Sequence, residues 1–231
     1  MAIKKIKISL IMNQNSYAGR EYLNNLKNNN IKIDVLSVGF FPEINTLESE
    51  RCGNLWIPEN ENKLAKFHNF HRFKSLKSKE LVNFLVCENY DLGIQGGTGI
   101  IDKSIINKYK LGILNFHPGL LPEYRGCSAP EWQIFENRKV YSTCHLIDEN
   151  IDTGDIVEIK KLNLVRSSYF EFRSSVYKET AKFLVEIIKK IIFQNGFKIK
   201  PYKQDEKKAR YHSYIGKDKI NFIKKTLFDN P

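Results

Sequence analysis

The chain has few cysteines, and none of them is spaced as a metal ligand. Its four cysteines, at positions 52, 87, 127 and 144, form no Cys-x-x-Cys motif and no zinc-type spacing. We therefore expect free thiols in a reducing cytoplasm, a cytoplasmic protein, and no bound metal.

Long apolar runs are also missing. Residues 1–12 loosely resemble a signal peptide, but their uninterrupted apolar run is short and polar Asn13-Gln14-Asn15 follows. Residues 183–193 are apolar but are interrupted by charged residues. We expect no membrane span and no membrane partner.

Acidic residues are outnumbered: 37 lysines and arginines against 26 aspartates and glutamates give a net charge of +11. The excess favours anionic partners such as nucleotide phosphates, a nucleic acid or a polyglutamate tail, although a lysine-rich surface without a ligand explains it equally well. A nucleic-acid-binding protein is one alternative. Because no helix-turn-helix, zinc or RNA-stacking pattern is present, we expect no nucleic-acid partner.

Hydrophobic periodicity predicts alternating strands and helices in the 231 residues. We expect strands at 3–12, 31–38, 91–95, 111–117, 140–147 and 156–164, and helices at 19–30, 76–89, 102–109, 130–137 and 169–194. Residues 39–74 are expected to be mainly loops. The pattern predicts a Rossmann-like α/β fold with a mostly parallel sheet and helices on both faces. We expect one main domain over residues 1–196 and a C-terminal extension over 197–231.

Two polar residues close the central strand. Asn115 and His117 are two positions apart, so their side chains point to the same face, and Pro118 favours an extended backbone up to the histidine. In open α/β sheets, ligands bind beyond the carboxyl ends of strands. An amide that stabilises an oxyanion beside an imidazole that moves a proton suits acyl transfer. A buried, satisfied polar pair is the alternative.

An acidic turn follows later in the chain. Asp152 lies in the segment 147–156, which contains three further carboxylates. If Asp152 approaches His117, we expect it to stabilise the imidazolium and raise the histidine pKa. A solvated hairpin is the alternative.

A glycine-rich segment, Gly96-Gly97-Thr98-Gly99, follows the predicted strand 91–95. It is not a phosphate-binding loop, because no Lys-Ser/Thr pair follows. It forms a tight turn, a close approach to a flat ligand, or both.

Together these segments resemble the signature of the 10-formyltetrahydrofolate-dependent formyltransferases. The pattern is Asn115-x-His117-Pro-x-Leu-Leu-Pro-x-Tyr-Arg-Gly, then His145, then Asp152-x-Gly154-x-Ile156, within residues 91–157. The resemblance implies a formyltransferase fold and N10-formyltetrahydrofolate as co-substrate. It also implies Asn115, His117 and Asp152 as the catalytic trio, with His145 in support. The implied folate-binding residues are Gly96, Gly97, Thr98, Gly99, Ile101, Ile147 and Asp148.

Departures from the family pattern bear on the acceptor amine. The turn after the first strand, residues 13–19, has one late glycine, unlike the phosphate-binding turn of glycinamide ribonucleotide formyltransferases. About 35 residues follow the last long helix, too few for the RNA-binding domain of methionyl-tRNA formyltransferases. Gly119 replaces a serine common in the family.

The resemblance is therefore closest to the sugar N-formyltransferases. It implies a nucleotide-linked amino-dideoxy sugar, with dTDP as the nucleotide, destined for a surface polysaccharide such as lipopolysaccharide O-antigen. The expected substrate-binding residues are Arg125, Lys74, Tyr211 and Tyr214. Family habit implies a homodimer. Phosphoribosylglycinamide formyltransferase and a non-catalytic folate- or nucleotide-binding module are the alternatives.

Overall fold

Seven strands form one sheet within residues 6–39, 46–136, 139–194 and 200–228, which the computed structural model describes. The strands are β1 (Ile8–Asn13), β2 (Asp34–Val38), β3 (Asn69–Phe73), β4 (Leu92–Gln95), β5 (Ile113–His117), β7 (Tyr141–Leu146) and β8 (Ile156–Lys161). The order across the sheet is β3-β2-β1-β4-β5-β7-β8. The first five are parallel, whereas β7 runs antiparallel to β5 and β8 antiparallel to β7. The prediction of a mostly parallel sheet is confirmed.

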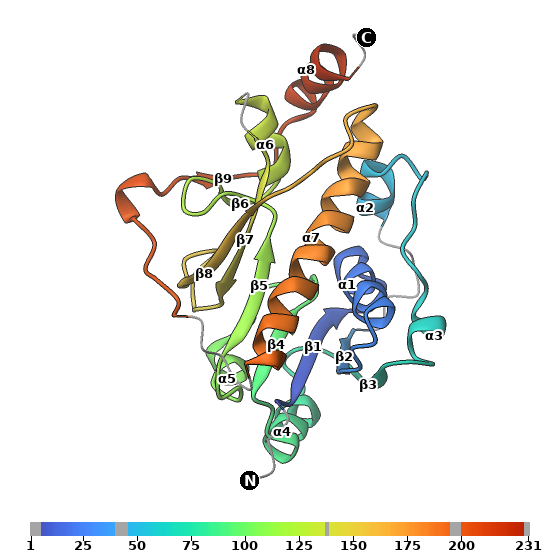
Figure 1. Cartoon of the computed structure of the whole chain (residues 1–231), viewed down its shortest axis with the longest axis vertical. Helices are drawn as coiled ribbons and strands as arrows, with labels where there is room; N and C mark the ends of the chain where they lie inside the picture. The colour runs from blue at the N-terminus through green and yellow to red at the C-terminus, as the bar shows by residue number, and fades with distance from the viewer. Residues whose placement is uncertain (1–5, 40–45, 137–138, 195–199, 229–231) are drawn as a thin grey trace.

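Helices cover both faces of this sheet (Figure 1). The helices α1 (Tyr17–Asn28) and α7 (Tyr169–Phe193) cover one face, and α4 (Lys79–Glu88) and α5 (Lys103–Ile106) the other. The structure also contains α2 (Thr46–Arg51), α3 (Glu61–Leu64), α6 (Ala129–Phe135) and α8 (Lys217–Leu227). Strand alternation produces two cores. Leu10 of β1 belongs to the cluster with α1 and α7, and its neighbour Ile11 to the cluster with α4 and α5.

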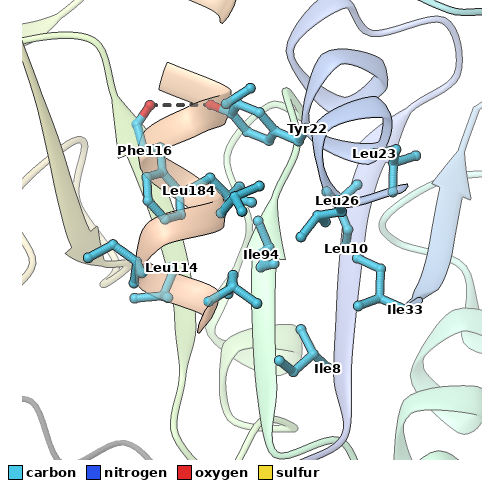
Figure 2. Close-up of a cluster of buried hydrophobic side chains, with 14 of the residues drawn as sticks. Ile8, Leu10, Tyr22, Leu23, Leu26, Ile33, Ile94, Leu114, Phe116 and Leu184 are labelled. Atoms are coloured by element: carbon cyan, nitrogen blue, oxygen red, sulfur yellow. Dashed lines mark hydrogen bonds between the residues drawn. The ribbon is translucent and has the colours of Figure 1, made fainter. Parts of the chain in front are cut away.

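The larger core lies under α1 and α7 (Figure 2). Leu184 of α7 is fully buried beside Leu114 and Phe116 of β5, and the hydroxyl of Tyr22 donates to the carbonyl of Phe116 at 3.5 Å. Packing against α1 and α7 therefore holds the end of β5 in place.

The sheet order reverses between β1 and β4, and the chain passes very close to itself there. A Cβ on Gly19, in α1, would lie 2.5 Å from the carbonyl oxygen of Gly96, just after β4. Only glycine fits this approach. A Cβ on Gly96 would in turn lie 2.7 Å from Leu10 Cδ2 and 3.0 Å from Gly19 Cα, so both glycines are needed for packing at the switch point, where ligands bind in such sheets.

A strand or helix is present at each predicted range. Most are shorter than predicted, although α1 and α6 begin earlier and β1 ends later. Residues 39–74, predicted to be mainly loops, contain α2, α3 and the edge strand β3. The expected strand start at residue 3 and the domain boundary at 196–197 lie outside the described residues.

The C-terminal extension packs on the main domain. Its strand β9 (Tyr211–His212) pairs with β6 (Arg125–Gly126), next to the motif loop. Ile215, just before α8, and Ile223, within α8, are buried in a third cluster with Ile134 of α6. The two parts share a core in the described residues.

We predict that Leu184→Ala lowers the free energy of unfolding by about 2–5 kcal/mol, because it opens a cavity in the larger core. Ile192→Ala on the same helix is the matched control, since Ile192 is 41% exposed and should cost less than about 1 kcal/mol. Urea unfolding measures both. Equal losses would contradict this description of the core.

Candidate functional site

Asn115 and His117 lie at the carboxyl end of β5, and His145 faces them from β7. The antiparallel register places Asn115 directly opposite His145. Asn115 Nδ2 lies 3.1 Å from His145 Nε2, while His145 Nδ1 lies 2.9 Å from the carbonyl oxygen of Leu146. A carbonyl only accepts, so Nδ1 of His145 carries the proton and Nε2 accepts from Asn115. His145 therefore orients the amide and leaves its second hydrogen available.

Asp152 reaches the same site from the turn between β7 and β8. Its backbone is left-handed, with φ 57°, a region that aspartate tolerates better than most residues. Its Oδ2 accepts from the backbone N–H of Gly126 at 2.8 Å and lies 3.4 Å from His117 Nδ1. Its Oδ1 lies 3.6 Å from His145 Nε2. The structure therefore brings Asn115, His117 and Asp152 together.

His117 is 6% exposed, and both of its ring nitrogens face acceptors. Nε2 lies 2.6 Å from the carbonyl oxygen of Tyr124, so it carries a proton and donates. The remaining nitrogen, Nδ1, faces Asp152. A proton taken up at Nδ1 therefore produces an imidazolium held between a carboxylate and a carbonyl.

The electrostatics of the pair differ from the sequence expectation. Burial lowers the pKa of His117 and outweighs the Asp152 carboxylate and the Tyr124 carbonyl, which raise it. Asp152 acts on this pKa in the expected direction, but the burial that reverses the net shift was not visible in the sequence. Burial raises the pKa of Asp152, but His117 and the Gly126 N–H lower it by more, so this pKa lies well below the usual range for an aspartate. At neutral pH the site holds a neutral imidazole beside a carboxylate.

A cavity of about 250 Å³ opens beside these residues. Asn115 and His117 line it together with Gly97 and Thr98 after β4. Further walls come from α1 and α7 and include Tyr22, Arg173, Val176, Tyr177 and Thr180. The glycine-rich segment and the end of β5 thus share one cavity, as their positions at the switch point require.

The α7 residues of this cavity were not identified from the sequence. Arg173 is buried, lies 3.3 Å from the Glu131 carboxylate, and its Nε is one of the buried polar atoms without a hydrogen-bond partner among the described residues. Thr180 Oγ1 is another. The available signal was polar residues at 173, 177 and 180, on the helix face that also carries Val176 and Leu184.

The other predicted folate-binding residues lie at different depths. Ile101 is buried in the core under α4 and α5, and Gly99 has open space around it. Ile147 and Asp148 line a second cavity, of about 460 Å³, with residues of α5.

The predicted substrate-binding residues do not gather at one place. Lys74 is exposed after β3. Arg125 is 1% exposed and donates to Tyr211 Oη at 3.1 Å. Tyr214 is 64% exposed and lines a groove of about 540 Å³ with Arg51. None of these four lines the cavity beside Asn115.

Gly119 packs against the ring of His117. A Cβ at this position would lie 2.5 Å from His117 Nε2 and 2.8 Å from the Cβ of Ala129. The glycine that replaces the common family serine therefore leaves room for the observed position of the ring.

In the described residues, no group of three or more metal-ligating side chains could hold an ion. The helices in that part of the chain also include none that is long and apolar enough to cross a bilayer.

Comparison with known proteins gives consistent results. The family model described as formyl transferase matches residues 6–188. A methionyl-tRNA formyltransferase from Pseudoalteromonas translucida is 31% identical over 166 residues, which cover 68% of this chain and 50% of that protein. The chain thus spans about half the length of this relative.

Two solved structures show the same fold. A sugar N-formyltransferase from Shewanella sp. FDAARGOS_354 has a TM-score of 0.61 at 20% identity, covering 90% of this chain and 77% of the other. WlaRD, a sugar 3N-formyl transferase determined in the presence of dTDP and 5-N-formyl-THF, has a TM-score of 0.59 at 20% identity, covering 90% and 70%. Because the formyl transferase model matches most of this chain, the chain belongs to the formyl transferase family.

Proposed function

We propose that the chain transfers a formyl group from N10-formyltetrahydrofolate to the primary amine of a nucleotide-linked amino-dideoxy sugar, with dTDP as the nucleotide. The observation that carries the proposal is the meeting of Asn115, His117 and Asp152 at the end of β5, beside a cavity. The product would enter a surface polysaccharide such as O-antigen.

In the proposed mechanism, a neutral amine attacks the formyl carbon and a tetrahedral oxyanion forms. The free N–H of Asn115, oriented by His145, donates to that oxyanion. His117 accepts the amine proton at Nδ1, and Asp152 stabilises the resulting imidazolium. The bond from carbon to N10 then breaks, and the proton passes to the departing folate nitrogen.

The folate would lie against the glycine-rich segment and the acidic turn. Gly97 has φ 80° and exposes its backbone at the cavity, so a flat ring can approach the main chain. Ile100 is 73% exposed and Ile151 is 50% exposed, one in each predicted folate loop. A pterin bound between these loops would cover both apolar side chains. Ile147 and Asp148 would complete its pocket beside α5.

The acceptor would occupy the cavity under α7. Arg173, Tyr177 and Thr180 offer polar groups for a hydroxylated sugar near Asn115. The groove with Tyr214, Arg51, Lys217 and Lys224 offers an aromatic ring and three cations for a base and a diphosphate. A cytoplasmic homodimer formed through the C-terminal extension is part of the proposal, supported by the exposed rings of Tyr211, Tyr214 and Phe222.

Methionyl-tRNA is the second candidate acceptor. The sequence relative at 31% identity is a methionyl-tRNA formyltransferase, and the net charge of +11 suits a polyanion. The proposed sugar would occupy the cavity under α7, whereas tRNA would also need a basic surface outside it.

The substrate assay supplies the first test. We expect formyltetrahydrofolate to be consumed with a dTDP-linked amino sugar, and Asn115→Ala to lower kcat about 100- to 1,000-fold through loss of the oxyanion donor. Mass spectrometry of the products measures both. Formylation of methionyl-tRNA or glycinamide ribonucleotide, without formylation of a sugar, would overturn the sugar proposal.

The pH profile supplies the second test. Because burial lowers the pKa of His117, we expect kcat/KM to rise with pH along an acid limb whose midpoint lies below the usual histidine pKa of about 6.5. Asp152→Asn removes a charge that raises this pKa, so the acid limb should move to lower pH while kcat falls. Asp155→Asn, in the same turn but paired with Lys203, is the control and should leave the limb in place. An acid limb that stays in place or moves to higher pH in Asp152→Asn would contradict the proposed pairing of Asp152 with His117.

A further inference from the structure

The buried amide of Gln204 joins the C-terminal extension to the turn that carries Asp152. Its Nε2 donates to the carbonyl oxygens of Asp152 at 2.9 Å and Gly154 at 2.8 Å. Its Oε1 accepts from Arg125 Nε at 3.1 Å and Nη2 at 2.8 Å. Two acceptors on one side and two donors on the other permit only one orientation of this amide.

Arg125 anchors Gln204 and has no donor left for a ligand. Besides its two bonds to Gln204, it donates from Nη1 to Glu206 at 3.0 Å and to Tyr211 Oη at 3.1 Å, and from Nη2 to Glu206 at 2.5 Å. These bonds account for all five N–H groups of a guanidinium. Its contacts therefore favour a role in positioning over the substrate-binding role predicted from the sequence.

The same extension also packs on Gly126 and Tyr124, whose backbone groups bind Asp152 and His117. Gly126, whose N–H binds Asp152, lies in β6 and is paired with His212 of β9. A Cβ on Gly126 would lie 2.4 Å from the His212 carbonyl oxygen. The ring of His212 stacks on Tyr124, whose carbonyl binds His117, with centroids 5.2 Å apart and planes at 12°.

We infer that residues 202–212 are a positioning element of the active site, in which Gln204, held by Arg125, sets the place of Asp152 relative to His117. Asp152 has a left-handed backbone and sits in a turn, so its carboxylate position depends on what holds the turn. The kinetic tests of this inference rest on the proposed function, because they measure formyl transfer.

The central test is Gln204→Met, which keeps the length and neutrality of the side chain but removes both halves of the amide. We expect kcat to fall about 10- to 100-fold, as for other groups that orient a catalytic residue, with KM values changing less than about threefold. Gln194→Met, the same substitution at an exposed position at the end of α7, is the matched control and should match the wild type.

A double-mutant cycle with Asp152→Asn separates positioning from a general structural role. If Gln204 acts through Asp152, adding Gln204→Met to Asp152→Asn should cost less than about threefold in kcat. Full and additive losses, or a wild-type kcat in Gln204→Met, would overturn the inference.

A readout without turnover keeps this test independent of the proposed function. The pKa of His117, followed by NMR of its ring, should fall in Gln204→Met in the same direction as in Asp152→Asn, and an unchanged pKa would overturn the inference. If the wild type formylates no amine, the proposed function fails. The pKa of His117 in Gln204→Met and in the wild type then still tests the positioning role of Gln204. Should Gln204→Met not fold, Arg125→Lys, which keeps the charge beside Glu206 but not the paired bonds to Gln204, is measured in the same way.

Discussion

The site depends on one interaction: a carboxylate held 3.4 Å from a buried imidazole. Burial favours the neutral ring, which can accept a proton, and Asp152 favours the charged ring that forms once it has done so. The balance requires that Asp152 be fixed in place. Much of the surrounding structure, from the left-handed turn to the pairing of β6 with β9, meets that requirement.

The fold supplies the remaining geometry through ordinary strand and sheet rules. The period of two along β5 puts Asn115 and His117 on one face, and the antiparallel register with β7 puts His145 opposite the amide. The reversal of strand order between β1 and β4 brings the glycine-rich segment to the same cavity. Residues from four separate parts of the chain therefore meet at a single strand end.

Local hydrophobic period predicted the sheet, and the resemblance to the formyltransferases singled out Asn115, His117 and Asp152, which the fold brings together. The sequence was not sufficient for β3, an edge strand whose side chains are only partly buried and show no core pattern. Arg173 and Gln204 were missed for a different reason: their partners, Glu131 and Asp152, are 42 and 52 residues away along the chain. The lowered pKa of His117 was not predicted, because burial is a property of the folded chain.

The central claim is that Asn115, His117 and Asp152 enclose the carbon that is transferred. A crystal structure with a non-transferring folate analogue and a dTDP-linked amino sugar tests it most directly. We predict the oxygen of the formyl group, or of the group that replaces it, within about 3 Å of Asn115 Nδ2, and the sugar amine within hydrogen-bond reach of His117. An amine bound away from His117, or a folate whose N10 end does not reach Asn115, would contradict the account.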